Sequence, residues 1–145
     1  MTEQQIKDTI RGYIKSWTAG DLKQALLFFA ADAVWTNPNG IFKGTAQIEK
    51  YLNWVNNLVK DYKITEIGIG IVVQENKAAI EHYLSGTING MKSNLLGMCT
   101  YEFKDGKIAN LKTCYDRLEQ AQQATKGINK WVVNMVVNGA QKGLS

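Results

Sequence analysis

The sequence predicts an α+β domain in which helices pack on one face of a curved antiparallel sheet. In the N-terminal part, apolar residues recur at three- and four-residue steps, which is the period of helices that bury one side. After Tyr62 the period changes to two, as in half-buried strands. The dipeptides Asn89-Gly90 and Asp105-Gly106 favour tight hairpins and separate consecutive strands. Helices followed by a meander of hairpins are typical of an α+β fold.

Three N-terminal helices are predicted, over residues 3–18, 22–31 and 45–60. Thr2 and Gln5 have the spacing of a capping box at the start of the first. Asp21 and Thr45 are the expected N-caps of the second and the third. Between these two helices we expect short strands, joined by a turn at 37–40, over residues 33–36 and 41–42.

Four longer strands are predicted next, over residues 63–75, 77–88, 91–104 and 107–116. In the first, strict alternation would place Ile67, Ile69, Ile71 and Val73 on one face. From about Leu118 the periodicity is helical again as far as the C-terminus, with Gly127 as the expected break.

The register of the last hairpin decides which side chains of its strands face inward. A two-residue turn at Asp105-Gly106 places Cys99 opposite Lys112, and then Cys99, Cys114 and Asp116 share one face. A bulge near the turn would reverse the faces of the last strand. Both registers remain open at this point, and both cysteines are expected to be free thiols.

The amino-acid composition argues against several classes of function. The chain has 145 residues, enough for one domain, and its net charge of 17 − 13 = +4 is scattered, so no nucleic-acid partner is predicted. One histidine and two cysteines are too few for a conventional zinc site, and no cofactor is expected. The polar N-terminus and the reduced cysteines are typical of a cytoplasmic protein. Four tryptophans and six tyrosines are the compositional anomaly.

Four short motifs resemble the nuclear transport factor 2-like superfamily, and most closely its SnoaL-like group of polyketide cyclases. These are Tyr13-Ile-Lys-Ser-Trp-Thr-Ala-Gly-Asp21, Phe28-Phe29-Ala-Ala-Asp-Ala33, Asn37-Pro38-Asn39-Gly40 with Lys43-Gly44, and Phe103-Lys-Asp-Gly-Lys-Ile108 followed by Tyr115-Asp116-Arg-Leu118. The resemblance implies a cone-shaped domain over residues 1–120 that encloses an apolar pocket, with residues 121–145 as a helical extension. Members include isomerases, cyclases, epoxide hydrolases, dehydratases and domains without catalysis, so the fold alone does not assign an activity.

Asp116 is the first catalytic candidate. The resemblance implies a catalytic aspartate at the end of the last strand, and Tyr115-Asp116-Arg117-Leu118 matches that context. A carboxylate desolvated by aromatic walls could abstract a proton next to a carbonyl or activate a water molecule. The alternative is that Asp116 caps the final helix.

His82 and Tyr13 are the supporting candidates. His82 lies on the more apolar face of its strand, where it is either a hydrogen-bonded core residue or a donor to a ligand. Tyr13 matches the tyrosine that ketosteroid isomerases use as an oxyanion donor, and is otherwise a core aromatic. The sequence departs from those isomerases at their general base, where it has Asn37, and at their second donor, where it has Cys99. It departs from limonene epoxide hydrolases as well, because His82 and Leu84 stand where those enzymes have Arg and Asp.

Further residues are expected to line the pocket or to belong to the core. They are Trp17, Trp35, Asn37, Tyr51, Trp54, Val55, Met98, Cys99 and Tyr115. Two functions remain open. In the first, the cone is a cofactor-independent isomerase, cyclase or dehydratase that acts on a small, apolar, oxygen-bearing molecule through Asp116. In the second, it is a non-catalytic domain for ligand binding or dimerisation.

The extension after residue 120 departs from the resemblance. Its apolar residues, among them Trp131 and Met135, form a wide stripe that needs a cover. The helix could close the cone as a lid, pack on the second subunit of a homodimer, or dock on a membrane surface. Its few lysines do not by themselves predict membrane binding.

Overall fold

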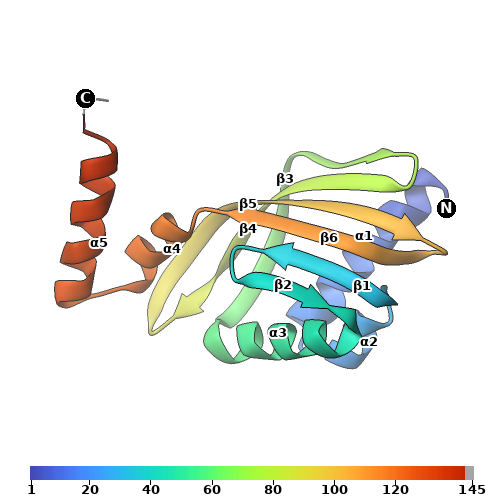
Figure 1. Cartoon of the computed structure of the whole chain (residues 1–145), viewed down its shortest axis with the longest axis horizontal. Coiled ribbons are helices and arrows are strands. Elements are labelled where there is room, and N and C mark those ends of the chain that lie inside the picture. Colours follow the sequence, from blue (N-terminus) through green and yellow to red (C-terminus); the bar gives the residue numbers. More distant parts are fainter. Residues whose placement is uncertain (143–145) are drawn as a thin grey trace.

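A computed structural model describes residues 1–142 and shows one six-stranded curved sheet with helices on one face (Figure 1). The elements are α1 (Glu3–Thr18), α2 (Leu22–Leu26), β1 (Phe29–Asn37), β2 (Gly40–Lys43), α3 (Gly44–Leu58), β3 (Lys60–Gln74), β4 (Lys77–Ile88), β5 (Met91–Lys104), β6 (Lys107–Tyr115), α4 (Arg117–Ala124) and α5 (Gly127–Ala140). The strand order is β2-β1-β6-β5-β4-β3, with β1 and β6 parallel and every other neighbouring pair antiparallel. The predicted α+β class is confirmed.

The helix boundaries differ from the prediction at two places. The capping box of Thr2 and Gln5 is present, but α2 ends at Leu26, and the chain is already a strand at Phe29. Tertiary contacts explain this, because the Phe29 ring packs edge-on against Tyr13, with ring centroids 5.1 Å apart, and its strand pairs with β6. Helix α3 begins at Gly44, so Thr45 is not its N-cap.

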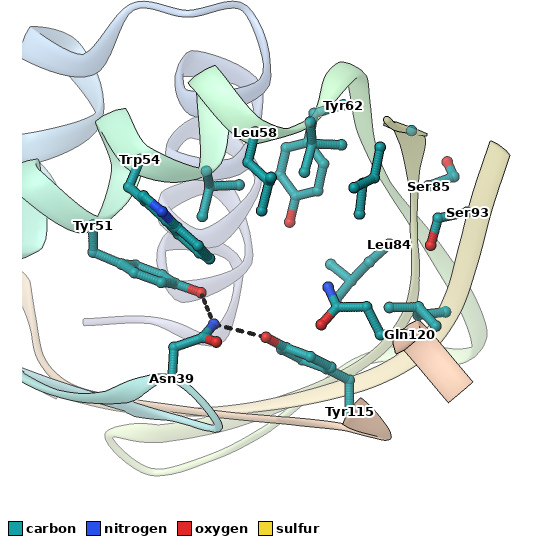
Figure 2. A pocket seen from close by; sticks show the side chains of 15 residues that line it. Asn39, Tyr51, Trp54, Leu58, Tyr62, Leu84, Ser85, Ser93, Tyr115 and Gln120 are labelled. Carbon is teal, nitrogen blue, oxygen red and sulfur yellow. Dashed lines mark hydrogen bonds between the residues drawn. The ribbon is translucent and has the colours of Figure 1, made fainter. Parts of the chain in front are cut away.

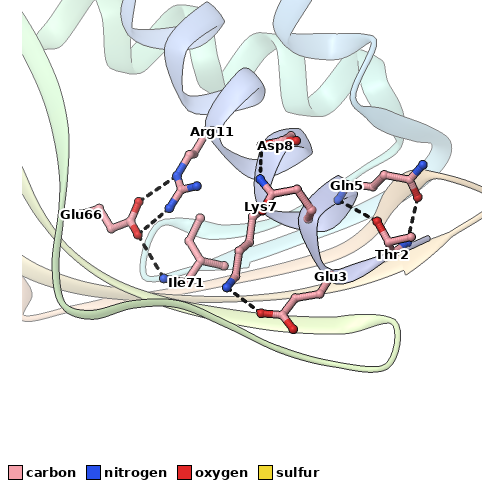
Figure 3. A network of polar contacts seen from close by, with 9 residues as sticks. Thr2, Glu3, Gln5, Lys7, Asp8, Arg11, Glu66 and Ile71 are labelled. Carbon is pink, nitrogen blue, oxygen red and sulfur yellow. Dashed lines mark hydrogen bonds and ion pairs between the residues drawn. The ribbon is translucent and has the colours of Figure 1, made fainter.

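Strand β3 does not alternate strictly. Gly68 and Gly70 have positive φ angles of 61° and 71°, and the ladder to β4 shifts between Glu66 and Ile71. Ile69 is consequently 80% exposed while Ile71 is buried, so the expected single face is wrong. Figure 3 shows the contacts that hold this irregular segment: Arg11 on α1 binds both carboxylate oxygens of Glu66, and Glu66 also accepts the backbone N–H of Ile71.

The register between β5 and β6 follows the bulged alternative. Phe103 pairs with Ile108, but Glu102 already pairs with Asn110, so one extra residue lies on β6. Cys99 therefore faces Thr113 instead of Lys112. The register without a bulge, in which Cys99, Cys114 and Asp116 share one face, is therefore wrong. Cys99 is buried, whereas Cys114 is exposed. The inner wall of the cone gains a threonine hydroxyl as a result.

The core lies between the inner face of the sheet and helices α1 and α3, and large aromatic rings fill much of it. Helix α5 stands away from the sheet at the far end of the molecule (Figure 1). Within residues 1–142, no helix is both long and apolar enough to cross a membrane. The predicted extension runs to residue 145, and its last three residues lie outside the described part.

Candidate ligand chamber

Two neighbouring chambers lie inside the cone. The mouth chamber, of about 50 Å³, is bounded by α3, the start of β3, parts of β4 and β5, and the end of β6. The inner chamber, of about 30 Å³, is bounded by α1 and the inner face of the sheet. The side chains that line both are Tyr51, Tyr62, Leu84 and Tyr115. These four residues therefore separate the mouth from the interior.

A chain of hydrogen bonds crosses the wall of the inner chamber. Trp35 Nε1 donates to Thr113 Oγ1 at 3.0 Å, Thr113 Oγ1 lies 3.2 Å from Cys99 Sγ, and Cys99 Sγ lies 3.2 Å from His82 Nε2. Burial lowers the pKa of His82 to about 4 and raises the pKa of Cys99 to about 11. Both groups are therefore neutral at neutral pH, and the pair is not an ion pair of thiolate and imidazolium.

Three polar atoms of residues that line the inner chamber are buried and have no hydrogen-bond partner within the described structure. They are Tyr13 Oη, Trp17 Nε1 and His82 Nδ1. Desolvation raises the pKa of Tyr13 well above its usual value, so its hydroxyl stays protonated and able to donate. An unsatisfied buried donor costs about 1–3 kcal/mol, and such atoms point to an occupant that would pair with them.

One amide links the two tyrosines at the mouth. Asn39 Nδ2 donates to Tyr51 Oη at 3.3 Å and to Tyr115 Oη at 2.8 Å, as Figure 2 shows. The turn that carries Asn39 is held by Asn37, whose Oδ1 accepts the Asn39 backbone N–H. From the sequence, Asn39 was predicted only as a turn residue, and Tyr62 was not among the candidate site residues. The available signal for Asn39 was its place in the family-like motif Asn37-Pro38-Asn39-Gly40.

Most of the predicted lining residues do meet at these chambers. Those on the inner chamber are Tyr13, Trp17, Trp35, Tyr51, His82, Cys99 and Tyr115, and Trp54 and Val55 line the mouth. Two predicted lining residues do not. Met98 lies on the outer face of the sheet because β5 alternates, and Asn37, although buried, lines neither chamber and uses its oxygen in the turn.

Asp116 lies outside both chambers. It is exposed, and its Oδ1 accepts the backbone N–H groups of Leu118 at 2.7 Å and Glu119 at 3.2 Å. It is thus the N-cap of α4, which was the alternative to its catalytic role. Among the described residues, the linings of the two chambers contain no carboxylate.

Replacing Asp116 with alanine is expected to lower the free energy of unfolding by about 1 kcal/mol, because α4 loses its side-chain cap. Asp116→Asn keeps an acceptor oxygen and should lose less. Urea denaturation of both variants measures the difference. If neither variant lost stability while ligand binding disappeared in both, the cap would not be the function of this carboxylate.

Comparisons with known proteins agree with this fold. A sequence model for the SnoaL-like domain matches residues 10–111. Among curated proteins, none matches the sequence at a significant level.

Three solved structures show the similarity of fold. A putative polyketide cyclase from Silicibacter is 20% identical, with a TM-score of 0.77 over 87% of this chain and 99% of that one. A hypothetical protein with a ketosteroid isomerase-like fold from Catenulispora acidiphila, in complex with trimethylamine, is 16% identical, with a TM-score of 0.74 over 81% of this chain and 92% of that one. An LEH-like epoxide hydrolase from M. tuberculosis is 12% identical, with a TM-score of 0.72 over 92% of this chain and 97% of that one.

Proposed function

Because the chain belongs to the family of SnoaL-like domains, we propose that its cone binds a small, largely apolar molecule that carries an acceptor oxygen. The observation that supports this most is the pair of unpartnered donors, Tyr13 Oη and Trp17 Nε1, on residues that line the inner chamber. The two residues are one helical turn apart on α1 and their rings stack at 5.9 Å, so they belong to the same wall.

The donors favour a neutral ligand with a carbonyl-type oxygen. A carbonyl oxygen has two lone pairs and can accept from both groups. The chamber offers a charged ligand no counter-charge, since His82 and Cys99 are neutral at neutral pH. A buried charge without a partner is strongly disfavoured, which argues against a carboxylate as the bound group.

The chambers also limit the size of the ligand. Their volumes of about 30 and 50 Å³ are small beside the roughly 300–1,000 Å³ of sites for drug-sized molecules. A larger ligand would have to separate Tyr51 from Tyr115, which breaks the hydrogen bonds of Asn39. We therefore expect either a small ligand or one that enters when the Asn39 amide releases a tyrosine hydroxyl.

We propose that the cone binds its ligand and that Asp116 does not catalyse a reaction of that ligand. That carboxylate caps α4 outside the chambers. The titratable base at the inner chamber is His82, and a pKa of about 4 makes it a weak base at neutral pH. These facts favour the binding interpretation over acid–base catalysis.

Cyclohexanone and methylcyclohexane form a matched pair of probes, because they have similar shape and only the ketone accepts hydrogen bonds. Two hydrogen bonds should make the ketone bind about tenfold or more tightly, measured by tryptophan fluorescence, to which Trp17 and Trp35 at the chamber contribute. Tyr13→Phe and Trp17→Phe should each remove a large part of this preference. Tyr83→Phe on the outer face is the control and should leave it intact.

Equal binding of the two probes, or a ketone preference that survives in both chamber variants, would contradict the proposal. So would failure of wild-type protein to bind the ketone at millimolar concentrations.

A further inference from the structure

His82 is buried in the sheet wall of the inner chamber, and one of its two ring nitrogens has no partner. The side chain is 1% exposed, and its Nε2 lies 3.2 Å from Cys99 Sγ. Its Nδ1 has no hydrogen-bond partner within residues 1–142. A neutral imidazole carries its proton on one nitrogen only, so Nδ1 is either a donor or an acceptor. The hydrogen bond made at Nε2 decides between the two forms.

The hydrogen bonds behind Cys99 have one direction in which every proton is used. The indole N–H of Trp35 can only donate, so Thr113 Oγ1 accepts it at 3.0 Å. The Thr113 hydroxyl then donates its own proton to Cys99 Sγ at 3.2 Å. The thiol proton of Cys99 is left for His82 Nε2. Nε2 is therefore an acceptor, and the imidazole proton lies on Nδ1.

The opposite direction leaves more groups unpaired. If His82 Nε2–H donated to Cys99 and the thiol donated to Thr113, the hydroxyl proton of Thr113 would have no acceptor within the described structure. Thr113 is buried, so that hydroxyl would lose the hydrogen bond that it makes with water in the unfolded chain. The lone pair of His82 Nδ1 would be unpaired as well. The first direction leaves only the Nδ1–H group without a partner.

Gly97 makes room for the Nδ1 edge of the ring. It pairs with His82 across β4 and β5, and it belongs to the buried positions of β5. A Cβ atom at position 97 would lie 2.7 Å from His82 Cε1, 3.2 Å from His82 Nδ1 and 3.3 Å from Leu84 Cδ1. The Nδ1 edge therefore lies over Gly97 and beside Leu84, which lines both chambers.

We propose that His82 presents Nδ1–H to the chambers as a further donor, and thereby selects neutral ligands that carry a second acceptor atom. This inference rests on the proposed function, in which Tyr13 and Trp17 hold the first acceptor oxygen. Those two residues belong to α1, whereas His82 belongs to the facing sheet, so the two acceptors lie at opposite ends of the ligand. Cys99 is a positioning residue, because it acts through the tautomer of His82.

Nitrogen-15 NMR of the single imidazole in ligand-free wild-type protein tests the tautomer directly. Nε2 is identified by its strong coupling to Hδ2, and a protonated ring nitrogen resonates well upfield of an unprotonated one. At neutral pH we expect Nδ1 to be protonated and Nε2 to be unprotonated. A protonated Nε2 with an unprotonated Nδ1 would overturn the inference, whether or not the protein binds a ligand.

Two variants of Cys99 test its positioning role by the same NMR measurement. Cys99→Ala removes the donor to His82 Nε2, so both tautomers should become populated. Cys99→Ser supplies an O–H donor at the same place and should restore the Nδ1–H form. Cys114→Ala is the matched control, since Cys114 is exposed, and it should leave the ring resonances unchanged. A ring that stays entirely in the Nδ1–H form in Cys99→Ala would show that Cys99 does not set the tautomer.

Cyclohexanone and tetrahydro-4H-pyran-4-one form the matched pair of probes for the second acceptor. Both are six-membered cyclic ketones, and the pyranone has an ether oxygen in place of the CH₂ group opposite the carbonyl. Wild-type protein should bind the pyranone about threefold to tenfold more tightly, because the ether oxygen accepts the Nδ1–H group. His82→Phe keeps an aromatic ring without the N–H and should abolish this difference. It should retain the preference for cyclohexanone over methylcyclohexane.

The inference and the proposed function fail in different ways. Equal binding of cyclohexanone and methylcyclohexane to wild-type protein would contradict the proposed function, and the tautomer would still be decided by NMR. A wild-type protein that prefers the ketone but binds the pyranone no more tightly than cyclohexanone would overturn the inference alone. So would an advantage of the pyranone that survives in His82→Phe.

Discussion

Replacing Trp35 with alanine is expected to lower the free energy of unfolding by about 4 kcal/mol. Trp35 is 2% exposed, and its ring meets Tyr51 edge-on at 4.9 Å and Trp17 edge-on at 5.6 Å. Alanine removes these contacts and leaves a large cavity in the wall of the inner chamber. It also removes the indole N–H that donates to Thr113, so the buried hydroxyl loses a partner.

Urea denaturation of three variants checks this prediction. Trp54→Ala makes the same substitution at a site that is 49% exposed, and should lose less than about half as much stability. Trp35→Phe keeps an aromatic ring but loses the hydrogen bond, and should fall between wild type and Trp35→Ala. Similar losses at Trp35 and Trp54 would show that the aromatic cluster around Trp35 is not the centre of stability.

Stability should fall as the pH is lowered from 6.5 towards 4, because His82 is buried in its neutral form. Its pKa is lowered from 6.5 to about 4, so in this window the unfolded chain takes up a proton that the folded chain refuses. Stability is fully present above pH 6.5 and is lost as the pH approaches the folded value. The shift of 6.5 − 4 = 2.5 pKa units corresponds to a loss of roughly 3 kcal/mol.

The chain has one histidine, which makes the assignment direct. The difference in unfolding free energy between wild type and His82→Gln should vary across this pH window and be constant above it. Proton NMR of the single imidazole in wild-type protein gives a second measurement that needs no variant. A resonance that titrates near pH 6.5 in the folded protein would contradict burial of the neutral form.

The sequence was sufficient for the α+β class and for most of the chamber wall, because both depend on periodicity and on large side chains. It was insufficient for the register of β6. Because of one extra residue between Ile108 and Asn110, Thr113 lies on the inner wall in place of Cys114. No local residue pattern predicts that bulge.

The start of α4 and the bulge in β3 show the same limit. Asp116 fits a catalytic motif and a helix cap equally well in sequence, and only the positions of two backbone N–H groups distinguish them. Strict alternation predicts that Ile69 and Ile71 share one face, yet two glycines with positive φ turn Ile69 outward. In each case the conformation of the local backbone, and not the sequence pattern, decides the outcome.

The amide of Asn39 has a consequence for rates. Both of its N–H groups are committed to tyrosines that line both chambers. On the proposed route through the mouth, a molecule passes only when this amide releases at least one ring. Ligands of very different affinity would then share one entry rate, set by how often the protein opens, and would differ in how long they stay.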